Sequence, residues 1–280
     1  MSDLIFNLLI LALVAGIAGY TAGLFGIGGG AFMVPALFFA FRSLDVDPTI
    51  VMHCAVATSA SVIIFNGWRS VRSHMDRGSV DMSILWPSDD RPWASYGLWI
   101  ALGSFLAAAF LAPRLSSQSL TLIFSSIAFL VAAQFIFGRP DFVIRSSVPK
   151  GVGPPIIGGS IGALSSIMGI GGGSLSVPFL TLFGVPVHKA IGTAAGFGLM
   201  IAIPATFGFI LSGWGVDGRW VASIGYVNLP ASIFILSFAW LLVPLGTASA
   251  HKLDATLLRR VFGVVLALIA LNMVRIALSF

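Results

Sequence analysis

The chain has 280 residues, of which 58% are hydrophobic and 9% are charged, and its mean hydropathy is +1.02. Soluble globular domains carry about 25% charged residues, so this composition excludes a water-soluble globule and predicts an integral membrane protein. The formal net charge of +5 comes from Lys and Arg residues scattered through polar connections, which indicates membrane orientation and not nucleic-acid binding. The single Cys54 excludes an intramolecular disulfide and a cysteine metal cluster, and no cofactor is expected.

Apolar stretches separated by polar connections predict an all-α membrane protein, since a membrane-crossing helix needs about 20 apolar residues. In the first half the expected helical elements are residues 4–24, 31–41, 49–68, 93–112 and 120–137. In the second half they are residues 152–168, 174–183, 188–211, 220–245 and 257–278. The longest hydrophilic segment, residues 69–92, lies in the first half.

The two halves share a repeated glycine motif. The sequence Gly-Ile-Gly-Gly-Gly occupies residues 26–30 and again residues 169–173, a displacement of 169 − 26 = 143 positions. Four flanking residues recur at the same displacement: Gly16 as Gly159, Gly19 as Gly162, Val34 as Val177 and Pro35 as Pro178. Further along, residues 78–81 match residues 225–228. The chain therefore consists of two membrane repeats, residues 1–138 and 151–280, joined by a cytoplasmic linker at residues 139–150.

The charge distribution predicts how the repeats lie in the membrane. Each repeat has five helical elements, an odd number, so the two repeats are expected to have inverted topology. The alternation puts 11 of the 15 Lys and Arg residues on one side and leaves Arg42, Arg114, Arg219 and Arg275 on the other. This split follows the positive-inside rule. We expect a multi-pass protein of the inner membrane with both termini on the non-cytoplasmic side. Whether residues 31–41 and 174–183 cross or re-enter stays open.

The glycine motifs interrupt the first helix pair of each repeat. Backbone groups freed in hydrocarbon need partners, so broken helices are tolerated where they are buried or line a cavity. Paired Gly-interrupted segments in two halves indicate a transporter's substrate site, where helix N-termini face anionic groups. Close packing of helices through small residues is the alternative. The residues expected to present amides to one anion are Gly28, Gly29, Gly30, Gly171, Gly172 and Gly173.

Six polar side chains in or beside the apolar helices are further candidate site residues: Thr58, Ser59, Thr193, Asn66, Asn228 and His53. The three hydroxyls either donate to the anion or bond to carbonyls of their own helices. The two asparagines either line the cavity or join helices. The histidine either couples transport to protons or lies at the membrane interface.

Enzyme chemistry finds little support in the sequence. All ten acidic residues are aspartates in or beside polar connections, and no convergent acid, base and nucleophile set lies within the expected spans. Residues 26–31 also match the dinucleotide pattern G-x-G-x-x-G/A, but an apolar span precedes them where that fold requires a strand. We therefore expect a protein that is not an enzyme.

Several of these motifs together resemble the TauE/SafE family of sulfite and organosulfur anion transporters. They are G-x-x-G followed by GIGGG and Val-Pro in each half, and then Ala-Val-Ala-Thr at residues 55–58 and Ala-Ile-Gly-Thr at residues 190–193. The resemblance implies secondary or facilitated transport of sulfite, thiosulfate or a small sulfonate across the inner membrane. We expect alternating access between the halves, with an anion channel using the same glycine loops as the alternative. The expected partners are a small anion and the lipid bilayer, and a homodimer is left open.

Overall fold

A computed structural model describes residues 30–86, 92–138, 143–250 and 255–279, together with seven positions between 9 and 20. In the first half the helices are α2 (Gly30–Ser43), α3 (Val51–Asp76), α4 (Met82–Leu85), α5 (Tyr96–Leu106) and α6 (Ser117–Phe137). In the second half they are α7 (Gly159–Met168), α8 (Gly173–Leu182), α9 (Val187–Ser212), α10 (Leu229–Ala250) and α11 (Ala255–Leu278). Short π-helical turns, Ala107–Leu111 and Pro154–Gly158, extend α5 and precede α7.

Five helical segments in the described ranges are long and apolar enough to cross a membrane: Val51–Asp76, Tyr96–Arg114, Ser117–Phe137, Val187–Ser212 and Arg260–Leu278. Large apolar side chains on their outer faces are exposed; Leu130 and Phe137 on α6 are 71% and 79% accessible. Such exposure suits lipid and not water, because soluble proteins rarely expose large contiguous apolar surfaces. The structure is therefore that of a multi-pass, predominantly helical membrane protein.

Two expected helix boundaries are wrong. Helix α3 continues to Asp76 instead of ending near residue 68, and the Arg69 guanidinium lies 4.4 Å from the centre of the Trp240 ring. The helix expected from residue 220 begins only at Leu229, because a short hairpin precedes it. Its two strands, β1 (Ser223–Ile224) and β2 (Val227–Asn228), have two residues each. Gly225 lies in the turn of this hairpin with φ at 56°, a left-handed backbone conformation that residues other than glycine rarely adopt.

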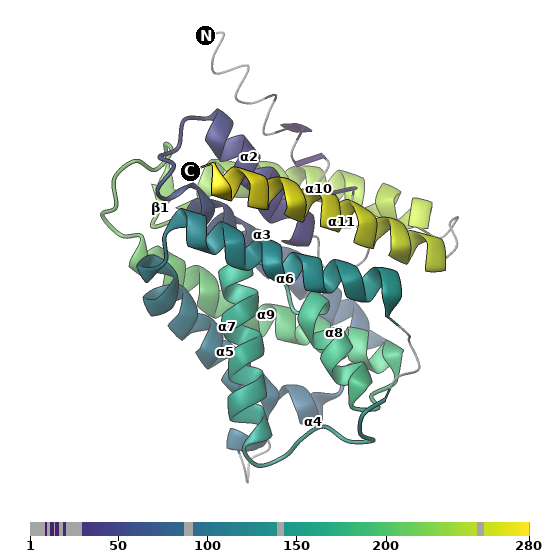
Figure 1. Ribbon diagram of the computed structural model, residues 1–280. Helices are drawn as coiled ribbons and strands as arrows, with labels where there is room; N and C mark the ends of the chain where they lie inside the picture. Colours follow the sequence, from purple (N-terminus) through teal and green to yellow (C-terminus); the bar gives the residue numbers. More distant parts are fainter. Residues whose placement is uncertain are drawn as a thin grey trace.

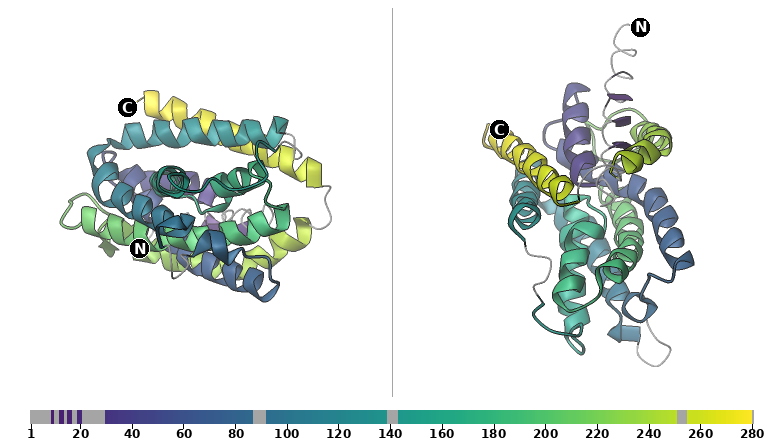
Figure 2. Two further views of the ribbon diagram at one scale, coloured as in Figure 1. Left: turned by 90° about the horizontal axis from the view of Figure 1, so that it is seen from below. Right: turned by 90° about the vertical axis from the view of Figure 1, so that its right-hand side faces the viewer.

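Helices α3 and α9 pack against each other at the centre of the molecule. The start of α3 and the end of α9 both contact the hairpin, whereas the start of α9 contacts the segment that follows α3, so the two run antiparallel. Helices α6 and α11 lie side by side and cross one end of the molecule (Figure 1, Figure 2). Helix α5 packs against α7 and α9 below them.

Glycines set the close approach of α5 and α7. A Cβ atom at Gly103 would lie 2.8 Å from the Gly159 Cα, and one at Gly162 would overlap the Ile100 carbonyl oxygen. Small residues at such crossings allow backbones to approach, which is how membrane helices pack without a hydrophobic driving force. Gly162, one of the flanking glycines of the repeat, therefore has a packing role in the second half.

We expect Gly162→Ala to lower the free energy of unfolding by about 1–3 kcal/mol, because overpacked contacts force helices apart. Gly159→Ala on the same helix is the matched control, since a Cβ atom there meets nothing within 4 Å. The control is expected to be neutral or to gain up to about 1 kcal/mol from reduced chain entropy. Unfolding of the purified proteins in detergent measures both. Equal stability of the two variants would contradict the packing assignment.

Candidate functional site

The second glycine motif forms a break between two helices. Helix α7 ends at Met168, and Gly169 follows in the left-handed conformation at φ 61°. Helix α8 begins at Gly173, and the Ser176 amide donates to the Gly172 carbonyl at 3.0 Å. The amides of residues 173–175 lie in the first turn of α8, where no carbonyl of the same helix is available to accept a hydrogen bond. The break thus presents a helix N-terminus, where anions are favoured.

The first glycine motif lies largely outside the described residues, so Gly28 and Gly29 remain predictions. Gly30, however, is the buried first residue of α2. A Cβ atom there would lie 2.9 Å from the Gly169 carbonyl oxygen and 2.9 Å from the Ile170 Cα. Backbone meets backbone at this point, so the end of the first motif and the start of the second are neighbours in space.

The second motif is closely surrounded on its other side. A Cβ atom at Gly172 would overlap the Ala194 carbonyl oxygen on α9, whereas one at Gly171 would lie 3.5 Å from the Ile63 side chain, an ordinary contact. Gly171 and Gly172 are both buried, and Gly173 is partly buried. In this conformation the loop is held between α3 and α9.

Ser59 joins α3 to the glycine loop. Its buried hydroxyl donates to the Gly169 carbonyl at 2.8 Å. The bond satisfies a carbonyl that the helix end leaves free, and it crosses from the first half of the chain to the second. In this conformation the Ser59 hydroxyl therefore bonds to the loop and not to a carbonyl of its own helix.

Thr58 and Thr193 occupy equivalent places and make equivalent bonds. The Thr58 hydroxyl accepts the Asn228 backbone N–H at 3.0 Å, and the Thr193 hydroxyl accepts the Asp81 backbone N–H at 2.9 Å. Both threonines are fully buried. Asp81 was not expected at the site, although its match to Asn228 in the repeat could have indicated it.

The predicted asparagines differ in their surroundings. The Asn228 side chain donates to the Ser223 hydroxyl at 3.0 Å and accepts the Ala231 amide at 2.9 Å, which caps the start of α10. Asn66 lies partly buried on α3, beside the point where Gly67 contacts Leu199 of α9. The structure thus brings Asn228 to Thr58 and leaves Asn66 further along α3.

His53 links the start of α3 to the turn between α5 and α6. Its Nε2 lies 3.1 Å from both the Ala112 and Leu115 carbonyl oxygens, and its ring stacks on Tyr226 at 5.1 Å. Because both neighbours are acceptors, Nε2 carries the proton. The contact gives this buried histidine a helix-joining role in the present conformation.

Three serines near the break went unnoticed in the sequence. The hydroxyls of Ser165, Ser174 and Ser176 are buried and have no hydrogen-bond partner in the described part of the chain. Unpartnered buried polar groups are uncommon and call for an explanation, such as an absent water or ligand. The equivalent positions of the first half hold Ala22, Ala31 and Met33, so a difference between the repeats was the available signal.

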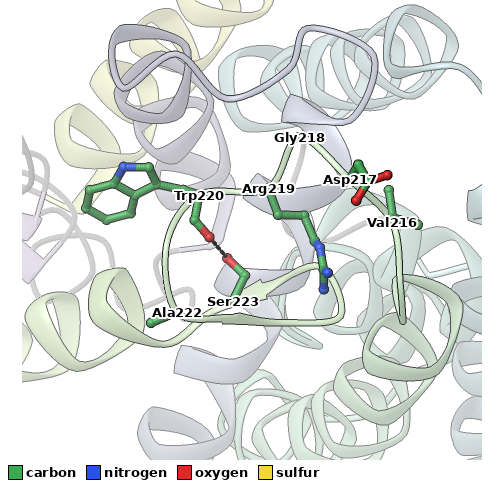
Figure 3. A pocket seen from close by; sticks show the side chains of 7 residues that line it. All are labelled: Val216, Asp217, Gly218, Arg219, Trp220, Ala222 and Ser223. Atoms are coloured by element: carbon green, nitrogen blue, oxygen red, sulfur yellow. Dashed lines mark hydrogen bonds between the residues drawn. The ribbon is translucent and has the colours of Figure 1, made fainter.

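A surface pocket of about 280 Å³ lies away from the glycine loop, in the connection from α9 to the hairpin (Figure 3). Its lining residues are Val216, Asp217, Gly218, Arg219, Trp220, Ala222 and Ser223. Arg219 donates to the Gly225 carbonyl at 3.1 Å, and Ser223 is bonded to Asn228. The pocket therefore adjoins the hairpin that carries Asn228.

Long apolar spans around a broken helix define a multi-pass membrane protein of the transporter type, and comparison with known proteins agrees. The profile of the sulfite exporter TauE/SafE family matches residues 11–273. The chain belongs to this family. A probable membrane transporter protein of Haemophilus influenzae is 33% identical over 272 residues, which cover 95% of this chain and 97% of the relative.

Other relatives carry the same kind of name. The probable membrane transporter protein YunE of Bacillus subtilis is 24% identical, over 96% of this chain and 97% of the relative. A probable membrane transporter protein of Methanocaldococcus jannaschii is 25% identical, over 81% of this chain and 80% of the relative. No solved structure matches the chain. The family and its relatives are membrane transporters and not enzymes, as the sequence predicts.

We expect Ser59→Ala and Ser174→Ala to have opposite effects on stability. Ser59→Ala leaves the Gly169 carbonyl without its partner and should cost about 1–3 kcal/mol. Ser174→Ala removes a buried hydroxyl without a described partner, so its stability should be unchanged or higher. Detergent unfolding measures both. Ser125→Ala is the control, because that hydroxyl bonds within its own helix to the Thr121 carbonyl. A loss in Ser174→Ala as large as in Ser59→Ala would contradict the assignment.

Proposed function

We propose that the protein is a secondary or facilitated transporter of a small sulfur-containing anion, such as sulfite, thiosulfate or a small sulfonate, in the inner membrane. Membership of the sulfite exporter TauE/SafE family supports the anion class. The observation that carries the proposal is the buried meeting of Gly30, the first residue of α2, with Gly169 and Ile170 in the break between α7 and α8.

Main-chain donors suit an anion in this setting. A helix N-terminus offers unpaired amides and a positive dipole end without the cost of burying a cation in hydrocarbon. The proposed site comprises amides of Gly28, Gly29 and Gly30 from the first half and of Gly171, Gly172 and Gly173 from the second. The serine hydroxyl of Ser174, in the first turn of α8 and without a described partner, adds a donor beside the second set.

Reciprocal contacts support two repeats of inverted topology. Gly162 of the second half packs on Ile100 of the first, and Gly19 of the first half packs on Ala239 of the second, with a Cβ atom at Gly19 placed 3.0 Å from the Ala239 Cα. Every contact across a two-fold axis occurs twice, once in each direction. A pseudo-two-fold relation of the halves, residues 1–138 and 151–280, accounts for both contacts and suits both termini on the non-cytoplasmic side.

The close packing of the loop supports alternating access. Ser59 of the first half holds Gly169 of the second, so the anion enters only when the halves separate. Separation of the halves exposes Thr58, Ser59, Thr193, Asn66 and Asn228 to the passage. In this mechanism one half rocks against the other, as in transporters built from inverted repeats.

We expect Gly171→Leu to abolish anion uptake into proteoliposomes, because the added side chain fills the space between the loop and Ile63. Gly171→Ala is the matched control and should retain most of the flux, since its Cβ atom makes only an ordinary contact at 3.5 Å. Uptake of labelled sulfite, thiosulfate and a small sulfonate is measured, with folding checked by thermal unfolding. Unimpaired flux in folded Gly171→Leu would reject the loop as the site.

The same vesicles separate a carrier from a channel. A carrier saturates with anion concentration and exchanges internal for external anion, whereas a channel does neither in this range. The transported anion should also raise the melting temperature of the parent protein, because only ligands that bind the folded state stabilise it. That shift should be lost in Gly171→Leu, and a shift that persists there would place the anion elsewhere.

A further inference from the structure

Two short segments, residues 78–81 and 225–228, each donate a backbone hydrogen bond to a buried threonine hydroxyl. The Asp81 N–H donates to the Thr193 hydroxyl of α9 at 2.9 Å, and the Asn228 N–H donates to the Thr58 hydroxyl of α3 at 3.0 Å. Each segment belongs to one half of the chain, and each threonine belongs to the other. The two bonds are therefore reciprocal contacts between the halves.

The two segments are built alike. A glycine in the left-handed conformation lies three residues before each donor, Gly78 at φ 63° and Gly225 at φ 56°. After the donor, the Asp81 carboxylate accepts the Ser83 amide at 3.1 Å and so caps α4, as Asn228 caps α10. The backbone makes the bond between the halves, and both side chains cap the helix that follows, so Asp and Asn share this role.

The segments reach their threonines from opposite directions. Figure 1 shows α4, which follows Asp81, and β1, which precedes Asn228, at opposite ends of the molecule. The antiparallel pair α3 and α9 runs between them. Each segment therefore closes the molecule from one end only.

Each threonine also adjoins a residue that holds the glycine loop. Ser59, next to Thr58, donates to Gly169 at one end of the loop. Ala194, next to Thr193, packs its carbonyl against Gly172 at the other end. Release of either threonine therefore loosens a different end of the same loop.

We infer that Asp81 and Asn228 are positioning residues of two latches, Asp81–Thr193 and Asn228–Thr58, which release alternately and open the glycine loop to one membrane face and then to the other. The inference rests on the proposed transport function and adds its gates. One neutral hydrogen bond per latch is weak enough to break and re-form during a transport cycle. A released threonine hydroxyl is then available to the anion.

The single cysteine makes a labelling test practical. Cys54, which is buried, is replaced by alanine, and Ser174→Cys adds one thiol in the first turn of α8. A membrane-impermeant maleimide is applied to sealed vesicles of either orientation, without any anion substrate. The latch variants are Thr193→Val and Thr58→Val, which keep the side-chain shape and remove the acceptor.

We expect each variant to be labelled faster from one face only. Thr193→Val should raise the labelling rate from the face that carries residues 78–85, and Thr58→Val from the face that carries residues 223–228. Loss of one hydrogen bond of ordinary net strength corresponds to about a two- to tenfold rise. Thr193→Ser and Thr58→Ser keep the oxygen and should restore the parent rates.

Thr206→Val is the matched control, since that hydroxyl bonds to the Ala202 carbonyl of its own helix at 2.7 Å. It should leave labelling from both faces unchanged. Latch variants that remain folded but show no change, or a rise from the same face, would overturn the inference. Because labelling needs no anion, side-specific labelling of the latch variants, together with no anion flux by the parent protein in proteoliposomes, would reject the transport proposal and leave the latches standing.

Discussion

A helix that breaks inside a membrane must have its freed backbone groups satisfied by the protein, and the structure depends on how this is done at residues 169–172. The Ile170 amide turns back to the Ser165 carbonyl at 3.1 Å, and the Gly169 carbonyl receives the Ser59 hydroxyl. Both neighbouring backbones, at Gly30 and Ala194, approach closely because the contacts involve glycine. The break is therefore held by α3 and α9 together, and any movement of one helix against the other acts on it.

The two halves use the same backbone plan with different side chains. Asp81 and Asn228 both cap a helix and both donate their amides to a threonine of the other half, yet α4 is a four-residue helix whereas α10 has 22 residues. The first half thus begins another helix at α5 where the second half continues in one helix. In the proposed mechanism, this difference between the halves lets the two faces of the membrane differ in how easily each side opens.

The sequence predicted helices better than contacts. Apolar length located the spans, and the displacement of 143 positions related the glycine motifs. The predicted start of α10 was wrong because the apolar run of the sequence continues through Val227. Only the turn at Gly225 and the helix cap at Asn228 separate the hairpin from the helix. The partners of Thr58 and Thr193 were beyond prediction, because residues more than 100 positions apart meet only through the packing of whole helices.

Two cations of the described residues, Arg69 and Arg219, lie away from the glycine loop. Arg69 lies over the exposed ring of Trp240, and Arg219 donates to Gly225 beside the hairpin. A cation buried at the loop would be costly to desolvate and would hold an anion too firmly to release it. Neutral amides and hydroxyls avoid both problems, and the bonds that must break on opening are single and neutral. In the proposed transport cycle, the free-energy gap between open and closed forms then stays within a few kcal/mol, the range that differential binding of one small anion can reverse.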